Sequence, residues 1–236
     1  MSDQNAETPQ AKILHLFRTK QMLCNDWDSV DPTMQTYAHL THGFSFFDRV
    51  LFDNQLPSAL ITFQRKKGMM GYFRRRQFES FDGVTAADEI ALNPLHFELG
   101  DKETLSTLGH EMVHLWQFHF GKVANPGDHN EEWATKMISI GLIPSHNALP
   151  GGKQTGRRMS HYIQPGGRFD RAADELIANG FVVAFVEQTS PEQQQLKMKK
   201  RASKTRFKCE SCRQVAWAKP GSELDCRRCR RPLVEM

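Results

Sequence analysis

The sequence has no long apolar run and few cysteines outside its last 28 residues. No segment approaches the roughly 20 apolar residues that a membrane-spanning helix needs. The first ten residues, MSDQNAETPQ, are polar and carry no hydrophobic signal region. From these absences we expect no membrane partner. We expect a cytoplasmic protein, one that could also associate with the nucleoid.

The five cysteines are unevenly distributed, because Cys24 stands alone and four lie close to the C-terminus. A cytosolic chain is not expected to use them as a disulfide framework, so the cluster indicates metal binding. Cys209-x-x-Cys212 and Cys226-x-x-Cys229 each present two thiolates, and 13 residues separate the two pairs. Four thiolates make a closed tetrahedral site, so we expect a structural zinc ion, with iron as the alternative.

The four cysteines lie in a segment of about 30 residues that is too short to bury a stabilising apolar core. Metal binding is therefore expected to supply its folding free energy. We expect Phe207 and Trp217 to form its miniature core. A stretch of this kind reads as a zinc ribbon over residues 207–236.

Charge is also unevenly distributed along the chain. Residues 197–236 contain 13 Lys and Arg against 4 Asp and Glu, whereas residues 1–196 contain 18 against 23. A basic block is either a solvated segment or a surface that tracks nucleic-acid phosphates, and the sequence favours neither. DNA is therefore one expected partner through the basic C-terminal region. A second cluster, Arg74 to Arg76, is read as a solvated face.

Periodic apolar residues predict a mixture of helices and short strands. We expect helices over residues 11–30, 36–52, 101–120, 130–140 and 169–179. We expect short strands over residues 59–65, 69–75 and 88–94. The helix that ends at Phe120 begins with Asp101 or Thr104 as its N-cap.

The segment GHEMVHLWQFHF, residues 109–120, carries the clearest chemistry. On a helix His110 and His114 lie about 40° apart, and Glu111 flanks that face. The spacing His-Glu-x-x-His lets two imidazoles bind one zinc ion while the carboxylate reaches a metal-bound water, whose pKa zinc lowers toward about 7. With ten histidines in the chain a chance match is the alternative. The opposite, core-facing side of the helix holds Leu105, Leu108, Met112, Leu115 and His119.

A catalytic zinc ion needs a third protein ligand. His119 is rejected because it lies about 180° from His110 and would point into the core. Phe120 stands six residues after His114, which excludes the extended motif that places a histidine there. The remaining candidates are His129, Glu131 and Glu132, and we favour His129.

These residues together resemble the SprT-like metalloproteases, the family that includes the protease domain of Spartan. The resemblance covers residues 40–143 and continues more loosely to about 190. It is carried by FFDRVLFDNQLPSALITF leading into GMMGYF, by EIALNP, TLSTLGHEMVHLWQ and DHNEEWATKM, and by the C-terminal cysteines.

The resemblance implies an α+β fold, a small zincin-like metalloprotease domain of helices on a short mixed sheet with a four-cysteine zinc ribbon. It implies a zinc-dependent endopeptidase with a protein substrate, one acting on DNA-associated or DNA-crosslinked proteins. His110, His114 and His129 resemble the three ligands of a catalytic zinc ion, which would be bound in addition to the structural zinc ion of the cysteines. Glu111 resembles the catalytic base. The family's third ligand usually sits in His-Gly-x-x-Phe or Trp, and here Asn130 replaces the glycine.

The expected organisation has four parts: an N-terminal extension over residues 1–35, the protease domain over 36–186, a basic linker over 187–206 and the ribbon over 207–236. Two other functions remain open, a nucleic-acid-binding adaptor with a non-catalytic scaffold and a metal-dependent hydrolase of a non-peptide bond. His161 and Tyr162 follow the matched core. They either reach the cleft, where a tyrosine hydroxyl would stabilise an oxyanion, or simply pack.

Overall fold

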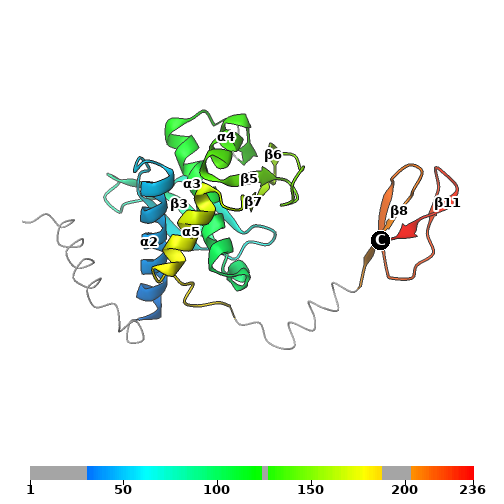
Figure 1. The fold of residues 1–236 in the computed structure, drawn as a ribbon, viewed down its shortest axis with the longest axis horizontal. Coiled ribbons are helices and arrows are strands. Elements are labelled where there is room, and N and C mark those ends of the chain that lie inside the picture. The colour runs from blue at the N-terminus through cyan, green and yellow to red at the C-terminus, as the bar shows by residue number, and fades with distance from the viewer. Residues whose placement is uncertain (1–30, 124–126, 188–202) are drawn as a thin grey trace, which may run out of the picture. The chain divides into compact units, whose positions relative to one another are not determined.

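The computed structural model describes residues 31–123, 127–187 and 203–236. The chain forms two compact units, Met1–Glu187 and Gln188–Met236, which are treated one at a time (Figure 1). The helix expected over residues 11–30, Cys24 and most of the expected linker lie outside the described residues. Within the described part of the chain, no helix is long and apolar enough to cross a membrane.

The first unit begins with helix α2, Pro32–Leu51. The Asp31 side chain caps it by accepting hydrogen bonds from the backbone N–H groups of Thr33 and Met34, and proline suits the first helical position because its missing N–H is not needed there. One face of α2 is buried, which confirms the predicted helix and extends it at its start. The buried apolar side chains of this face are Leu40, Phe46, Phe47 and Leu51.

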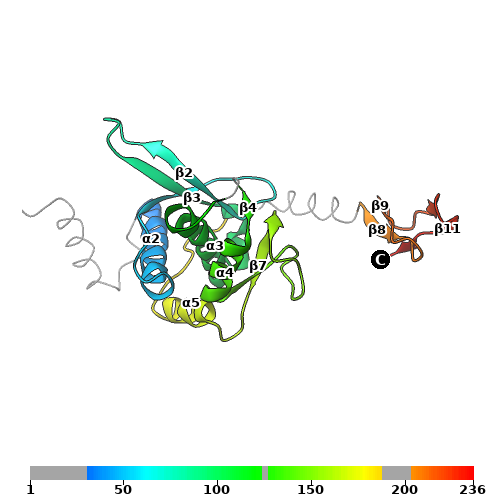
Figure 2. The ribbon, with the colours of Figure 1, turned by 90° about the horizontal axis from the view of Figure 1, so that it is seen from above.

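A mixed three-stranded sheet follows, with the order β1-β3-β2. Its strands are β1 (Ala59–Phe63), β2 (Gly71–Glu79) and β3 (Ala86–Leu92). β1 runs parallel to β3, whereas β2 pairs with β3 as an antiparallel hairpin that projects from the unit (Figure 2). The register shifts between Arg74 and Phe78, where Arg76 has φ 43° and donates its N–H to the Asp88 carboxylate at 2.6 Å. All three predicted strands are present.

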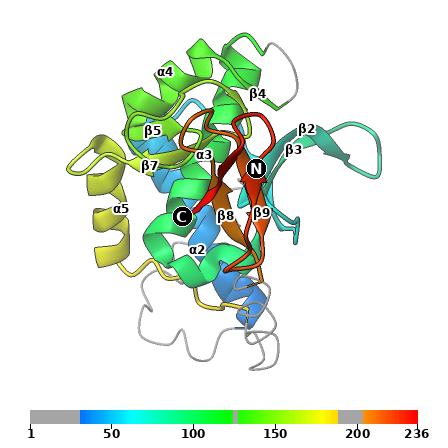
Figure 3. The same cartoon turned by 90° about the vertical axis from the view of Figure 1, so that its right-hand side faces the viewer.

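Helix α3, Asp101–Phe120, contacts the sheet strands β2 and β3 as well as α2 and two later helices (Figure 3). Its N-cap is Gly100 with no side-chain cap, one residue before the nearer of the two predicted positions. The remaining elements of the unit are η2 (Pro94–Leu99), β4 (Asp128–His129), α4 (Glu131–Ile140), β5 (Leu142–Ser145), β6 (Gly156–Arg157), β7 (Ser160–Ile163) and α5 (Arg168–Ala178).

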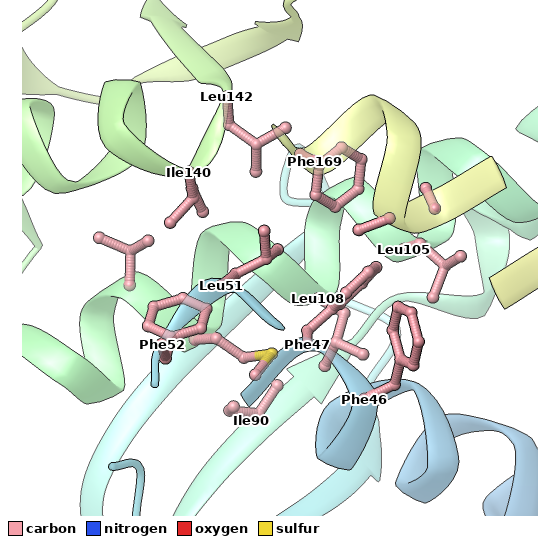
Figure 4. Packing of buried hydrophobic residues seen from close by; sticks show 14 of the residues in the cluster. Phe46, Phe47, Leu51, Phe52, Ile90, Leu105, Leu108, Ile140, Leu142 and Phe169 are labelled. Atoms are coloured by element: carbon pink, nitrogen blue, oxygen red, sulfur yellow. The ribbon is translucent and has the colours of Figure 1, made fainter. Parts of the chain in front are cut away.

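The core packs around the face of α3 that was predicted to be apolar (Figure 4). Gly109 lets α3 approach its neighbours closely, because a Cβ there would lie 3.2 Å from Leu142 and 3.3 Å from Phe169. Close packing on this side fixes α3 against β5 and α5, and so fixes the histidines on its other side. The side chains of α3 that are fully buried in the core are Leu105, Leu108, Met112, Val113 and Leu115.

The second unit consists of short strands. A three-stranded antiparallel sheet has the order β12-β8-β9, and β10 pairs with β11. Phe207 is buried as predicted, but Trp217 is 65% exposed, so its assignment to the miniature core is wrong. Side chains alternate between the faces of a strand, and Trp217 lies on the outward face of β9 opposite Arg206. The strands are β8 (Thr205–Lys208), β9 (Val215–Ala218), β10 (Asp225–Cys226), β11 (Arg231–Pro232) and β12 (Val234–Glu235).

Candidate metal centres

The structure brings His110, His114 and His129 together from α3 and β4. Their candidate ligand nitrogens lie within 4.8 Å of one another, and the Nε2 atoms of His114 and His129 are 3.2 Å apart. Zinc–nitrogen bonds of about 2.0–2.1 Å at the tetrahedral angle would place two ligand nitrogens about 3.3–3.4 Å apart. Three imidazoles in this arrangement fit a zinc ion and leave a fourth position open.

His129 is held by its strand pairing and by the start of α4. β4 pairs with β6, and the Nδ1–H of His129 donates to the carbonyl of Gly156 at 3.0 Å, which leaves Nε2 for a metal. Asn130, at the position where the family usually has glycine, is the N-cap of α4 and accepts from the backbone N–H of Trp133 at 3.0 Å. The replacement therefore supports the turn that carries the ligand.

The ring of Trp133 packs against all three histidines. Its centroid lies 4.3 Å from that of His129, 5.0 Å from that of His110 and 5.4 Å from that of His114. Burial lowers the pKa of His110 and of His129, and it lowers that of His114 to about 3. The imidazoles are therefore neutral near pH 7, which is the protonation state that metal ligation needs.

Glu111 lies on the same helix and its side chain reaches the same space. Burial raises the pKa of its carboxyl to about 8, and none of the described residues hydrogen-bonds to it. Gly71 of β2 leaves room for this carboxyl, since a Cβ there would lie 3.1 Å from Oε1 of Glu111 and 2.9 Å from the Ala91 carbonyl oxygen. A carboxyl with no structural partner beside three imidazoles suits an acid–base role.

A cavity of about 1000 Å³ opens over these four residues. Its walls come from β2, from α3 and from the chain between residues 157 and 161. Its volume lies at the upper end of the roughly 300–1,000 Å³ that ligand sites span. Its basic residues are Lys66, Arg74, Arg75, Arg157 and Arg158.

The other candidate ligands lie outside the histidine cluster. Glu131 is exposed, and Glu132 accepts hydrogen bonds from the backbone N–H of Lys122 at 2.6 Å and from Nε2 of Gln117 at 3.1 Å. His119 is not a ligand, as predicted, but it does not point into the core. It is exposed in the last turn of α3, where its Nε2 lies 2.6 Å from Oδ2 of Asp88.

Of the two residues beyond the matched core, His161 lines the cavity and Tyr162 does not. β7 pairs with β5, so successive side chains of β7 alternate in direction. The sequence raised both as candidates without deciding between them. Gly156, whose carbonyl orients His129, carries no motif that would have identified it.

The four cysteines of the second unit form the other candidate centre. Their sulfur atoms lie within 4.8 Å of one another, with Sγ of Cys212 and Sγ of Cys226 3.5 Å apart. Four sulfurs about 2.3 Å from a zinc ion would be about 3.8 Å apart, so the cluster fits a tetrahedral thiolate site. The N–H of Cys212 bonds the Cys209 sulfur and lowers the pKa of that thiol, which favours the thiolate.

The two Cys-x-x-Cys turns have the same backbone form. Arg213 donates its N–H to the carbonyl of Cys209 at 2.8 Å, and Arg230 donates to that of Cys226 at 2.7 Å. Both arginines have positive φ, 60° and 52°, an uncommon conformation for residues other than glycine. Each turn thus directs two thiols inward by the same local geometry.

Comparison of the sequence with known proteins identifies a family that includes the residues of the histidine centre. The SprT-like family model matches residues 40–150. An uncharacterized protein in the mucB 3' region of Salmonella typhimurium is 41% identical over 59 residues, which cover 25% of this chain and 80% of that protein. The chain belongs to the SprT-like family. The resemblance seen in the sequence is confirmed over residues 40–150, and the structure confirms the mixed class of helix and sheet.

SprT-like proteins are metalloprotease-like, and the candidate histidine centre lies inside the matched segment. The match ends at residue 150, before the β6 and β7 strands and before the C-terminal unit. The assignment of a zinc ribbon therefore depends on the four cysteines alone.

Proposed function

We propose that this SprT-like protein is a zinc-dependent endopeptidase of zincin type, with His110, His114 and His129 as the ligands of the catalytic metal. The observation that carries the proposal is the convergence of these three imidazoles on one point beside the carboxyl of Glu111, at the floor of an open cavity. A purely structural metal site would be closed by a fourth protein ligand.

Zinc, when bound there, supplies a Lewis acid that lowers the pKa of a coordinated water. With zinc bound, Glu111 would hold the proton from this water at a carboxylate oxygen and would pass it to the amine of the departing peptide. Gly71 leaves the space in which the carboxylate moves this proton. Trp133 excludes water from one side of the histidines and keeps their rings in place.

The test compares Glu111→Gln with the wild type, both as zinc-loaded full chains, on a fluorogenic protein substrate with and without single-stranded DNA. Loss of the base is expected to reduce the rate at least 100-fold, since general acid–base catalysis contributes about 10²–10⁴. Zinc content should not change. The matched control is Glu131→Gln, a nearby exposed carboxylate, which should retain full activity. Equal rates for wild type and Glu111→Gln would refute the proposal.

We propose further that the C-terminal unit is a zinc ribbon that directs the protease to DNA-associated proteins in the cytoplasm. The exposed Trp217 supports a nucleic-acid contact, because its ring lies opposite Arg206 on the outward face of a sheet. An exposed aromatic ring with a cation at the opposite position of the neighbouring strand offers a stacking platform for an unpaired base, and such stacking is worth about 1–3 kcal/mol. Trp217→Ala should weaken binding to single-stranded DNA by that amount, and no change would contradict this part.

The same exposed ring favours a second candidate function, an adaptor in which the protease unit is a scaffold. Under that reading the full chain binds DNA with strong salt dependence, while the zinc-loaded wild type shows no more proteolysis than Glu111→Gln. Cleavage that disappears in Glu111→Gln would exclude it.

A further inference from the structure

A fourth histidine lies behind the metal ligand His110. His161 of β7 places its Nδ1 3.1 Å from Nδ1 of His110 and its Nε2 3.0 Å from Oγ of Ser106. Ser106 in turn lies 2.9 Å from the carbonyl oxygen of Glu103. His161 does not belong to the cluster of candidate ligands. It forms a chain of hydrogen bonds that ends on that cluster.

The direction of this chain follows from its far end. The carbonyl of Glu103 only accepts, so the Ser106 hydroxyl donates its single proton there and accepts from His161. His161 therefore carries its proton on Nε2, and as a neutral imidazole it accepts on Nδ1. Nδ1 of His110 must then be the donor in the 3.1 Å contact. This order leaves the lone pair of His110 on Nε2, the nitrogen that can bind a metal.

His129 shows the same arrangement with a different acceptor. Its Nδ1–H is held by the carbonyl of Gly156, whereas that of His110 is held by His161. Both acceptors belong to the short arm over residues 156–163, which contains β6 and β7. Metal-bound histidines almost always donate their second N–H to such a partner, and loss of the partner typically costs 10–100-fold in metal affinity or activity.

We propose that His161 is a positioning residue that fixes His110 in the tautomer able to bind the metal, and that the arm over residues 156–163 completes the metal centre. The proposal assumes the metal centre of the proposed function and adds to it residues beyond the segment that the family model matches. It assigns His161 no contact with the substrate and no place among the ligands.

The test measures the affinity of the full chain for Co²⁺ by competition with a chelator. His161→Phe keeps a ring of similar size without an acceptor, and His161→Asn places an amide oxygen close to the position of Nδ1. We expect the apparent dissociation constant of the histidine site to rise 10–100-fold in His161→Phe and to recover partly in His161→Asn. The four-cysteine site gives a sulfur-to-cobalt charge-transfer band, so it serves as an internal reference that should not change.

The matched control is His119→Phe, since His119 lies on α3 outside the cluster and should leave Co²⁺ affinity unchanged. Wild-type affinity in His161→Phe would overturn the positioning role, while the protease proposal would stand as long as Glu111→Gln is inactive. A wild type that binds Co²⁺ at the cysteines alone would overturn the histidine centre and this inference with it. If His161→Phe does not fold, Ser106→Ala replaces it, because it removes the acceptor that orients His161. A smaller rise in the same direction is then expected, and unchanged affinity again overturns the role.

Discussion

The two candidate metal centres are built in opposite ways. The histidine centre lies on α3, whose other face packs in an extensive apolar core, and hydrogen bonds from outside the ligand set orient two of its three imidazoles. In the C-terminal unit, by contrast, Phe207 is the one large apolar side chain that is buried among the described residues. In the first unit a metal would therefore bind to a fold that is already stabilised by its apolar core. In the second unit the metal would supply most of the folding free energy.

Metal removal should produce the largest difference between the two units. With a strong chelator we expect amide hydrogens of β8 and β9 to lose their protection, because structural zinc supplies an apparent free energy of about 10–16 kcal/mol to such small units. Amide hydrogens of α3 should stay protected. Hydrogen exchange of the full chain checks both at once. Loss of protection in α3 would show that the first unit also depends on its metal.

The next largest difference between the two units is expected in their response to truncation of a buried side chain. Leu108→Ala should destabilise the first unit by about 2–5 kcal/mol and leave it folded at 25 °C. Phe207→Ala should cost about 3–5 kcal/mol and, with no second large side chain to compensate, weaken Co²⁺ binding at the cysteines. The control is Trp217→Ala, which should leave the cobalt spectrum unchanged because that ring is 65% exposed. A weakened cysteine site in this control would contradict the exposed placement.

A smaller effect is expected from crowding the carboxyl of Glu111. Gly71→Ala would place a methyl group 2.9 Å from the Ala91 carbonyl oxygen, and overpacking of this kind typically costs about 1–3 kcal/mol. We expect lower proteolytic activity with Co²⁺ affinity unchanged at both centres. Activity equal to that of the wild type would show that β2 does not define the position of Glu111.

The smallest effect is expected from the loss of one ion pair, whose contribution to stability depends on pH. Lys102 of α3 lies 2.8 Å from Oδ1 of Asp170 on α5 and lowers the pKa of that carboxyl. Because the folded-state pKa is depressed, the pair stabilises the first unit above the unfolded value near 3.9, and this contribution is lost as pH falls through the folded value. For a partly exposed pair it amounts to about 0–1 kcal/mol. Asp170→Asn should lower the unfolding free energy at pH 7 by that amount and make no difference at a pH well below the folded-state pKa of Asp170.

The sequence predicts well what depends on local periodicity. The spacing of His110, Glu111 and His114 follows from helix geometry, and the position of His129 depends on a helix start that Trp133 and Asn130 define nearby. The strands and the Cys-x-x-Cys turns are local in the same sense. The predicted zinc ligands and base are close together in the structure, while the ions and their chemistry remain predictions.

What the sequence did not reveal depends on contacts between distant segments. His161 reaches His110 from β7, which is held by its pairing with β5, and no local pattern encodes that pairing. His119 does lie across the helix from His110, but the last turn of α3 extends past the edge of the core, where Asp88 binds the imidazole. Trp217 was misplaced because a four-residue strand is too short for its pattern to show which face is covered.

The arm over residues 156–163 supports two of the candidate metal ligands, but it lies outside the His-Glu-x-x-His motif in the sequence. A fragment ending at Pro150 would retain His110, Glu111, His114 and His129 and the whole of the family match, yet it would lose the carbonyl of Gly156 and the imidazole of His161 together. Loss of this arm would therefore remove the hydrogen-bond acceptors of two candidate ligands at once and leave the His-Glu-x-x-His motif intact.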